Sequence, residues 1–496
     1  MIPPHADTQM GAKLCFSMNR TPFLGVLGIA SYLREHGHTV QILDGVRISV
    51  GNGYSGELMN WQMDWWTQNF KPDLILVSVL TADFYEAQNL IRYLRECYKD
   101  CVIVAGGPHP SGDPIACLMQ VPELDGVGIG AGEETCLQLA SGVGIEDVDN
   151  CAYLAGDDVV FTRKSKVEKH LDKYPYPAWD LVDTRYYCEP NMNSVFGLLT
   201  RSLPVVSGRG CPNHCYFCSA AGKGGFRVHS IPYIIKYCGW LVKQYPVDTL
   251  AFWDDVLGAS IKRVEQFCEA FIKSGLHKLV GWSAQLRATS ILASMRGKSG
   301  LLELMQAAGC VKISFGAESG SQNTLETLNK GVSTSENFRA ALMLEQSGIP
   351  YSMSLMLGVP GESLEDMQAT FWFIKSFPNA HFGVGRFCPL PGSPAYTDLV
   401  GKGLLFPLDV DWCKLGNFTL VDGPYFGAAS HTDFKRLLRK VKKHIAVGNR
   451  HFFLRHNTRF PEVTRLYRVG FGRRVLQRLV PDSLKATGRK LLQEAS

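Results

Sequence analysis

Short apolar runs alternate with segments of helical periodicity along the first 150 residues, and this alternation constrains the fold more than any other feature. The apolar runs lie at 13–18, 39–44, 73–80, 101–107 and 125–134, and the helical segments at 22–37 and 84–99. Strands that alternate with helices of this length form a doubly wound parallel sheet. We therefore expect an N-terminal Rossmann-like α/β domain over residues 1–150.

Glycine-rich loops follow the expected strands, at 18–25, 78–84, 105–114 and 128–135. In doubly wound sheets, ligands bind at the carboxyl ends of the strands, where such loops lie. No G-x-G-x-x-G follows the first strand, which disfavours a dinucleotide. Glycines allow a flat or bulky ligand to lie close to the backbone. The alternative is a degenerate Rossmann-like domain that binds nothing.

Three cysteines within eight residues form the most specific motif of the chain. Cys211, Cys215 and Cys218 have C-x3-C-x2-C spacing on a loop that follows the strand-like run 204–210. Thiolates in such a cluster suit zinc or an iron–sulfur cluster. A closed zinc site needs a fourth ligand, for which His214 and His229 are candidates. The other reading is a [4Fe–4S] cluster in which three thiolates leave one iron open to an outside ligand.

A second series of strand-like runs alternates with helices after residue 200. These runs lie at 204–208, 249–255, 279–288, 310–319, 351–362 and 381–392. Six such units predict a partial (β/α)6 barrel of the TIM type over residues 201–400, with its site at the carboxyl ends of the strands. Residues 151–200 form the connector, and its proline-rich and aromatic stretch 171–187 indicates a packed rather than a flexible segment.

The chain resembles the radical S-adenosylmethionine (SAM) enzymes with a cobalamin-binding domain, of the class B methyltransferase-like kind. The matching stretches are GVLGIASYLREHGHTVQILD, AGGPHPS, DGVGIGAGEET, CPNHCYFC and GAESG. The resemblance covers roughly residues 10–400. Ala131 departs from the family, which usually has Glu there, and the absence of D-x-H-x-x-G implies a cobalt without a histidine lower ligand. The implied cofactors are a [4Fe–4S] cluster, SAM and cobalamin.

The resemblance also implies a role for individual residues, each of which could instead be a strand-end or capping residue. The cluster would be bound by Cys211, Cys215 and Cys218. SAM would contact Phe217, Asp254, Asp255, Ser283, Gln285, Arg287, Glu318, Leu357 and Gly358. Cobalamin would contact Leu24, Gly25, Ser78, Thr81, Gly106, Gly107, Pro108, His109, Gly130, Gly132 and Glu133. Cys388 is a candidate catalytic cysteine, although a buried structural thiol is the favoured interpretation.

The function implied by the resemblance is methyl transfer to an unactivated carbon of a small-molecule substrate. One SAM would methylate the cobalt, and a second SAM on the cluster would yield a 5′-deoxyadenosyl radical, so that the substrate radical collects methyl from methylcobalamin. The first alternative is a cyclase or ring-rearranging enzyme that acts on a porphyrin or polycyclic lipid without methyl transfer. The second is a non-catalytic cobalamin-binding sensor. A flavodoxin- or ferredoxin-like electron donor is the implied protein partner.

The C-terminal region 401–496 is basic, with 17 Lys and Arg against 4 Asp and Glu from residue 432 onward, although the whole chain carries only +5. Residues 434–445 and 473–480 are basic amphipathic helix candidates. This region could cover the more acidic domains or contact a membrane surface, whereas nucleic acid is disfavoured because no RNA-binding module is recognisable. No apolar run reaches the ~18 residues of a membrane span, and no signal-peptide pattern opens the chain. We expect a cytoplasmic protein, with peripheral membrane contact as an option.

Overall fold

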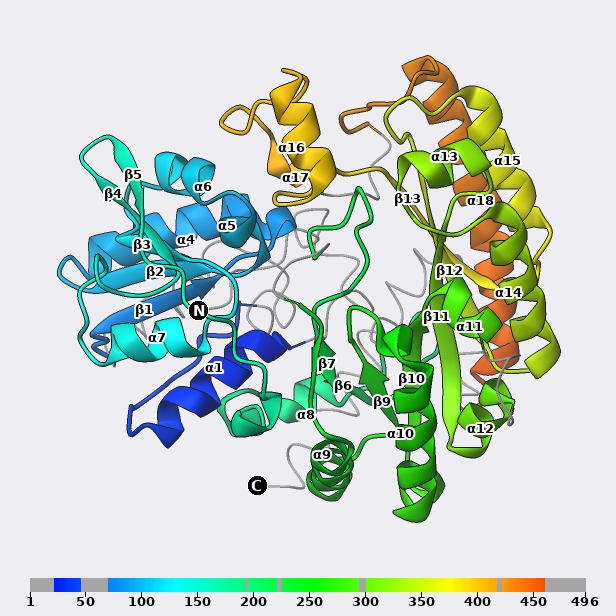
Figure 1. Cartoon of the computed structure of the whole chain (residues 1–496), viewed down its shortest axis with the longest axis horizontal. Coiled ribbons are helices and arrows are strands. Elements are labelled where there is room, and N and C mark those ends of the chain that lie inside the picture. Colours follow the sequence, from blue (N-terminus) through cyan, green and yellow to red (C-terminus); the bar gives the residue numbers. More distant parts are fainter. Residues whose placement is uncertain are drawn as a thin grey trace, which may run out of the picture.

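The computed structural model describes residues 22–45, 70–191, 195–220, 225–293, 300–416 and 422–459. Within these ranges the chain forms two large sheets that lie next to each other, each covered by helices (Figure 1). The N-terminal sheet is on the left of Figure 1 and the barrel sheet on the right. Two short helices of the C-terminal region, α16 (Pro394–Gly401) and α17 (Trp412–Leu415), lie between them at the top.

The N-terminal sheet has the strand order β1-β2-β3-β4-β5. Its strands are β1 (Leu74–Ser78), β2 (Val102–Gly106), β3 (Gly126–Gly128), β4 (Cys151–Ala155) and β5 (Asp158–Phe161). β1, β2 and β3 are parallel, as expected, whereas β4 and β5 form an antiparallel hairpin on the edge of β3. The sheet therefore continues beyond the expected domain boundary at residue 150. Its helices are α1 (Leu24–Glu35), η2 (Thr81–Asp83), α4 (Phe84–Cys97), α5 (Pro108–Gly112), α6 (Pro114–Gln120) and α7 (Glu133–Ala140).

One predicted strand of this domain is wrong. Residues 39–43 have no regular secondary structure, and Asp44 contributes only an isolated bridge. The Asp44 carboxylate instead accepts a hydrogen bond of 2.6 Å from the Tyr187 hydroxyl of the connector. The predicted strand at 13–18 lies outside the described residues.

The connector is packed against both domains, as its composition predicts. It contains η3 (Leu171–Lys173), η4 (Trp179–Leu181) and α8 (Thr184–Tyr187). Trp179 is fully buried, and its indole N–H donates to the Tyr237 hydroxyl on the first barrel helix at 2.9 Å. On the other side, the Ala178 amide donates to the Leu27 carbonyl of α1. The connector therefore joins the two sheets through buried contacts.

The predicted barrel is confirmed, because all six strands belong to one parallel sheet of order β13-β12-β11-β10-β9-β6. The strands are β6 (Ser202–Val205), β9 (Thr249–Phe252), β10 (Gly281–Leu286), β11 (Cys310–Glu318), β12 (Tyr351–Leu357) and β13 (His381–Arg386). The helical elements are α9 (Ile231–Gln244), η5 (Leu257–Ala259), α10 (Ile261–Lys273), η6 (Leu276–Lys278), α11 (Ala288–Ala293), α12 (Leu301–Ala307), α13 (Gln322–Thr327), α14 (Thr334–Ser347) and α15 (Leu364–Lys375). A two-stranded ribbon, β7 (Gly208–Arg209) and β8 (Arg227–Val228), flanks the cysteine loop.

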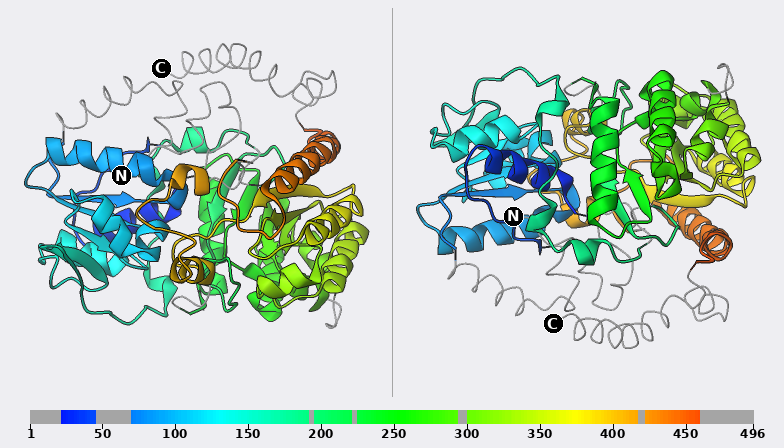
Figure 2. Two further views of the ribbon diagram at one scale, coloured as in Figure 1. Left: turned by 90° about the horizontal axis from the view of Figure 1, so that it is seen from above. Right: turned by 90° about the horizontal axis from the view of Figure 1, so that it is seen from below.

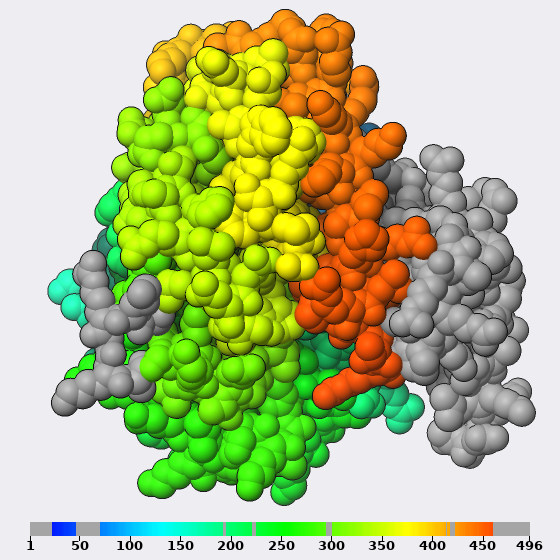
Figure 3. Space-filling model, turned by 90° about the vertical axis from the view of Figure 1, so that its right-hand side faces the viewer, coloured from blue at the N-terminus to red at the C-terminus, as the bar shows by residue number. Residues whose placement is uncertain are grey.

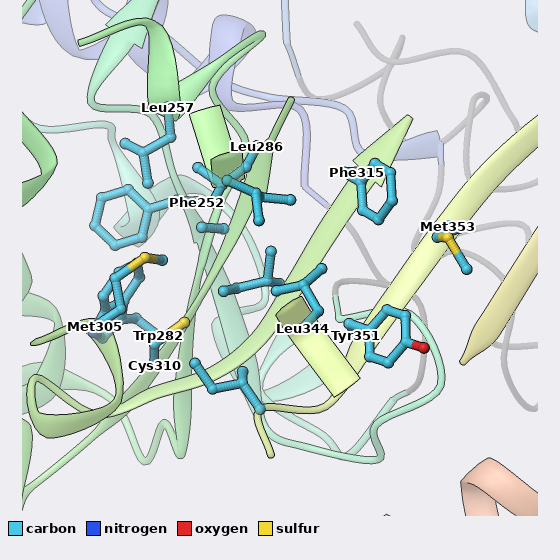
Figure 4. Packing of buried hydrophobic residues seen from close by; sticks show 14 of the residues in the cluster. Phe252, Leu257, Trp282, Leu286, Met305, Cys310, Phe315, Leu344, Tyr351 and Met353 are labelled. Atoms are coloured by element: carbon cyan, nitrogen blue, oxygen red, sulfur yellow. The ribbon is translucent and has the colours of Figure 1, made fainter. Parts of the chain in front are cut away.

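The barrel core lies between the strands and these helices (Figure 4). Phe252, Phe267 and Trp282 meet edge to face, with ring centroids 5.0–5.9 Å apart. Ser333 and Ser363 close capping boxes at the starts of α14 and α15, which satisfies amide groups that a helix start leaves unpaired. Local signals of this kind explain why the sequence predicts the barrel elements well.

The C-terminal helix α18 (His431–His456) packs on the open side of the barrel, beside β13 and α15 (Figures 1 to 3). Its buried residues are Phe434, Leu437, Leu438, Val441, Ile445, Phe452 and Phe453. The apolar side chains that are interleaved with the charges of 434–445 therefore belong to the core and leave the cations on the outer face. The predicted helix at 473–480 lies outside the described residues. Among the helices that the structure describes, none is long and apolar enough to cross a bilayer.

Candidate functional site

The cysteine loop lies at the carboxyl end of β6, and side chains from other strands hold it from several sides. The Tyr216 amide donates to the Leu328 carbonyl at 2.9 Å, and the Asn329 side chain donates to the His214 carbonyl at 2.8 Å. The Ala395 amide donates to the Tyr216 carbonyl at 2.8 Å. The loop is thus fixed by segments that lie more than 100 residues away in sequence.

The three thiols fit a cluster better than a single ion. Cys215 is buried, whereas Cys211 and Cys218 are partly exposed. Among the described residues, no group of three or more His, Cys, Asp or Glu side chains is close enough to bind one metal ion. In a [4Fe–4S] cluster each thiolate binds a different iron, so the three sulfurs need not converge on one point. Neither His214 nor His229 belongs to such a group among the described residues, and His229 instead contacts Asp172 at 3.2 Å.

Nitrogen donors approach two of the sulfurs. Arg287 Nη1 lies 3.5 Å from Cys215 Sγ, and Asn213 Nδ2 lies 3.3 Å from Cys211 Sγ. Hydrogen bonds to sulfur tune the charge and potential of an iron–sulfur cluster. The same Arg287 guanidinium donates to the Lys330 carbonyl. Arg287, predicted to contact SAM, therefore lies beside the cysteine loop and links it to residues 328–330.

Glu318 is placed next to the cysteine loop by a distortion of β11. The register between β11 and β12 shifts between Gly316 and Glu318, and Glu318 has a φ of +61°, which non-glycine residues rarely adopt. Its carboxylate pairs with Lys330 Nζ at 2.7 Å, and both side chains are buried. A Cβ atom at Gly316 would lie only 2.0 Å from Glu318 Oε1, so a side chain there would displace the Glu318 carboxylate from its present position. Backbone strain of this kind is typical of functional sites.

Lys330 belongs to the site, although no role for it follows from the sequence. Its ammonium pairs with Glu318 and lies 5.7 Å from the centroid of the Phe217 ring, within the cysteine loop. The Asn-Lys-Gly segment at 329–331 was visible in the sequence, but its partners come from β11 and from the cysteine loop. A contact formed across such distances in the chain leaves no local signal.

The two aspartates after β9 hold the turn that leads into the cysteine loop. Asp254 is 4% exposed and accepts hydrogen bonds from the Ser207 amide and hydroxyl at 3.2 and 2.8 Å. Asp255 accepts a 2.9 Å hydrogen bond from the Gly210 amide. Such contacts are those of residues that hold a strand end, which is the alternative to a role in SAM binding. Asp255 remains exposed and keeps room for a ligand.

Burial raises the pKa of Asp254 to about 6, against the opposing effect of the Ser207 hydrogen bonds. The folded chain then keeps a proton that the unfolded chain releases near pH 4, so this residue lowers stability as pH rises from about 4 to about 6. We expect the unfolding free energy of the wild type relative to Asp254→Asn to fall by about 2–3 kcal/mol over that range. Urea unfolding at a series of pH values measures it.

The control for this prediction is Asp248→Asn, at the opposite end of the same strand. The hydrogen bond and ion pair with Arg201 lower the pKa of Asp248, despite partial burial. The wild type should therefore gain stability over Asp248→Asn as pH rises from the acid range. Equal pH profiles for wild type and Asp254→Asn would contradict the assignment of Asp254.

The remaining residues predicted for SAM are divided between the barrel interior and the core. Ser283 is buried and Gln285 is exposed on the interior side of β10. Leu357 is fully buried in the core. Gly358 has a φ of +81°, and a Cβ atom there would lie 3.0 Å from the Tyr425 ring. Tyr425 thus lies against the face of Gly358 from which a Cβ atom would project.

The residues predicted for cobalamin gather at the carboxyl edge of β1, β2 and β3. Ser78 and Gly106 are in register at the ends of β1 and β2, and Gly107 has a φ of +101°. A Cβ atom at Gly107 would lie 2.9 Å from the Val79 carbonyl oxygen, so the fold itself requires this glycine. In contrast, Gly25 and Gly130 face open space, because a Cβ atom at either position would have no heavy atom within 4 Å. These open glycines form the kind of edge that can accommodate a bulky ligand.

His109 and its neighbours are buried rather than open. The His109 ring lies tilted against Phe84, with centroids 4.0 Å apart, and meets the Trp412 ring edge-on at 5.2 Å. Its Nδ1 lies 3.3 Å from the Thr81 hydroxyl, and burial lowers its pKa to about 3. His109 and Thr81 therefore lie in the interface with α17, and Pro108 is exposed beside them.

The closing loop of the first domain contacts the turn before the cysteines. Glu133 Oε1 pairs with Arg209 Nη1 at 2.6 Å, and the Glu133 side chain is 6% exposed. Gly132 precedes it at the start of α7. Leu24, Gly25, Glu133 and Arg209 line a cavity of about 110 Å³ between α1 and the barrel. Glu133 therefore joins the two predicted cofactor regions.

Replacing Glu133 with glutamine is expected to weaken this junction by about 2 kcal/mol, because Arg209 loses its charged partner in a largely buried position. Urea unfolding and retention of iron and cobalamin measure the effect. Glu134→Gln is the matched control, since Glu134 pairs with Lys173 at the surface and should cost less than about 1 kcal/mol. Equal losses in the two variants would refute a special role for Glu133.

The loop that contains Cys388 also contacts both domains. The Tyr396 hydroxyl donates to the Asp113 carboxylate of the first domain, and a Cβ atom at Gly112 would overlap the Pro391 backbone. Burial raises the pKa of Cys388 to about 12, so its thiol stays protonated at neutral pH. This environment favours the structural interpretation of Cys388 over the catalytic one.

A cavity of about 950 Å³ lies on the outer side of the cysteine loop, between α16, residues 404–411 and residues 424–427. Tyr216 belongs to its wall and donates to Asp398 at 2.7 Å. None of the residues predicted for SAM or cobalamin lines this cavity. We therefore place the candidate site on the inner side of the cysteine loop.

Family models match both parts of the chain. Residues 205–374 match the radical SAM superfamily, and residues 18–140 match the B12 binding domain. The chain combines a B12-binding domain with a radical SAM domain. It is an enzyme of the radical SAM type, and its cofactors are SAM, a [4Fe–4S] cluster and cobalamin.

Curated relatives of this two-domain enzyme share about a quarter of its residues. An uncharacterized methyltransferase of Pyrococcus horikoshii is 25% identical over 85% of this chain and 86% of its own length. An anaerobic magnesium-protoporphyrin IX monomethyl ester cyclase of Rubrivivax gelatinosus is 26% identical over 77% of this chain and 67% of its own length. The solved radical SAM methyltransferase TsrM of Kitasatospora setae has a TM-score of 0.62 at 15% identity, with 77% of this chain and 75% of that chain covered. That likeness confirms the fold.

Proposed function

We propose that this B12-binding radical SAM enzyme transfers a methyl group to an unactivated carbon of a small-molecule substrate. The observation that carries the proposal is the Glu133–Arg209 ion pair, which joins the glycine-rich edge of the first domain to the turn before Cys211. It supports two cofactors that face a common space. When bound there, the cluster and SAM would supply hydrogen abstraction, and cobalamin would supply the methyl group.

The residues of this chain would bind, orient and shield these groups. Cys211, Cys215 and Cys218 would hold the cluster, with Arg287 donating toward the Cys215 sulfur. Glu318, fixed by Lys330, presents a carboxylate beside the loop, as expected for a contact to SAM. Gly25 and Gly130 leave the open edge that cobalamin needs. The connector and the 388–396 loop would exclude water from the space between the domains.

The test is product analysis of the anaerobically reconstituted enzyme with SAM labelled in its methyl group. Candidate substrates are tested in parallel, and a methyltransferase yields 5′-deoxyadenosine, S-adenosylhomocysteine and a labelled product. A cyclase, the second candidate that the Rubrivivax relative favours, yields 5′-deoxyadenosine and an unlabelled product. Protein that carries both cofactors yet never forms 5′-deoxyadenosine would refute the radical reaction and favour the sensor.

The enzyme acts on a small-molecule substrate and needs an electron donor. We propose a flavodoxin- or ferredoxin-like donor for the cluster. Peripheral membrane contact through α18 would rest mainly on charge, because most of its large apolar side chains are buried and Val447 is the exposed exception. Binding to anionic vesicles that is lost at high salt would support such contact.

A further inference from the structure

The strands of the barrel have one apolar and one polar face. Leu286, Phe315, Met353 and Phe382 form one row across β10 to β13, and all are at most 4% exposed under the outer helices. The residues that precede them in sequence form the next row, on the opposite face of the sheet, because side chains alternate along a strand. This second row faces the barrel interior and consists of Gln285, Ser314, Ser352 and His381.

The interior face is lined by small polar groups and is open in its upper part. Gly316, Ser354 and Gly383 form the next row, in which only Ser354 has a side chain larger than hydrogen. Ser354 and Gly383 are exposed, although β12 lies inside the sheet and β13 packs against α18. A Cβ atom at Gly383 would meet only the Ser354 hydroxyl, at 3.9 Å. The barrel interior therefore has room for a ligand between β11 and β13.

Lys312 lies at the floor of this space. It precedes Ser314 by two residues on β11, so its side chain leaves the same face of the sheet about 6–7 Å deeper. The side chain is 1% exposed, and its ammonium has no hydrogen-bond partner among the described residues. No described carboxylate forms an ion pair with it. Burying an amine without a hydrogen-bond partner costs free energy whether or not it carries a proton, so the fold bears this cost without an evident internal benefit.

The groups around Lys312 are aromatic rings, and burial together with the neighbouring Lys312 lowers the pKa of His381 well below its usual value. The Lys312 ammonium lies 4.9 Å from the Phe452 ring centroid of α18, and the His381 ring lies 5.4 Å from the same ring. His381 Nδ1 has no hydrogen-bond partner among the described residues either. Burial lowers the pKa of Lys312 well below its usual value, and an anion in contact with it would oppose that shift. The floor thus presents unpaired nitrogen groups that an oxyanion would satisfy.

We infer that the barrel interior binds the substrate end-on, with a carboxylate or phosphate group of the substrate at Lys312 and His381. The hydroxyl- or amide-bearing body of the substrate would lie along Ser314, Ser352 and Ser354, with its reacting carbon toward the cysteine loop. This inference rests on the proposed function, because it names the class of substrate for that site.

Binding to the reconstituted full-length enzyme, measured by titration calorimetry without turnover, tests the inference. The probes are inorganic phosphate with glycerol 3-phosphate, acetate with glycerate, and glycerol as the neutral control. Each pair compares a parent ion (phosphate or acetate) with an extended anion that carries hydroxyl groups (glycerol 3-phosphate or glycerate). At least one extended anion should bind at least tenfold more tightly than its parent ion, because its hydroxyl groups also reach Ser314, Ser352 and Ser354. Glycerol should show no binding. Since no reaction is needed, failure here is distinguishable from failure to methylate.

Two variants locate the site. Lys312→Met should weaken binding of the extended anion at least tenfold. This variant should fold, because it leaves no partner unpaired. Lys375→Met, on the exposed side of α15, is the control and should not change binding. Gly383→Leu should block the extended anion but spare the parent ion, which keeps the inference testable if Lys312→Met does not fold. Absence of anion binding, unchanged binding in Lys312→Met, or equal affinity for parent and extended anions would overturn it.

Discussion

Cys215→Ala is expected to abolish the cluster and all formation of 5′-deoxyadenosine from SAM. Cys215 is the buried member of the trio and receives the Arg287 guanidinium at 3.5 Å, so no neighbouring side chain can replace its sulfur. Iron content, the visible absorption of the anaerobic protein and product analysis measure the loss. The B12-binding domain should still retain cobalamin, because its glycine edge lies on another sheet.

Cys388→Ala is the matched control, since it removes a thiol that lies outside the trio. It should keep full iron content, because burial keeps this thiol protonated and no cluster ligand is lost. Two results would argue against the assignment: a Cys215→Ala protein that retains iron and cleaves SAM, or a wild-type protein that binds zinc in a closed site. Loss of activity in Cys388→Ala with full iron would instead assign a role to Cys388.

Glu318→Gln is expected to lower the unfolding free energy by about 3–5 kcal/mol, because it leaves the Lys330 ammonium buried without a counter-charge. SAM cleavage should fall with it, since Lys330 lies over Phe217 and its carbonyl accepts from Arg287. Urea unfolding of the reconstituted enzyme and 5′-deoxyadenosine formation measure the two effects.

A double variant distinguishes the ion pair from loss of packing. Glu318→Gln combined with Lys330→Met should be more stable than Glu318→Gln alone, because both charges are then gone. Glu326→Gln, on the exposed side of α13, should change stability by less than about 1 kcal/mol. If the double variant is less stable than Glu318→Gln, the pair does not act as proposed.

Much of the fold follows from patterns that are local in sequence. All six barrel strands were predicted, although the runs at 351–362 and 381–392 continue past the ends of β12 and β13 into the following loops. Each strand is a short apolar run between helices with their own capping residues, such as Ser333 and Ser363. The strand expected at 39–44 is wrong: residues 39–43 have no regular secondary structure, and the Asp44 carboxylate accepts a hydrogen bond from Tyr187 of the connector. The hairpin β4–β5 was missed because it adds to the sheet after the expected boundary.

The sequence predicts the general location of the site better than the contacts of its individual residues. Glycine loops and strand ends gather where parallel strands end, so the general location of the predicted residues follows from topology. However, Asp254 and Asp255 hold the turn before the cysteines, Glu133 pairs with Arg209, and His109 packs against Trp412. Each of these partners comes from another element, and none is recognisable from the residue type alone.

The sequence by itself determined the three thiols, their spacing and the two α/β units, because these depend on residues that are neighbours along the chain. Only the tertiary structure decided that Lys330 supports Glu318, that Glu133 joins the domains, and that Lys312 lies unpaired at the floor of the barrel. The physical reason is that the energy of a charged side chain depends on burial and on its partner. Both are set by segments distant in sequence that folding brings together.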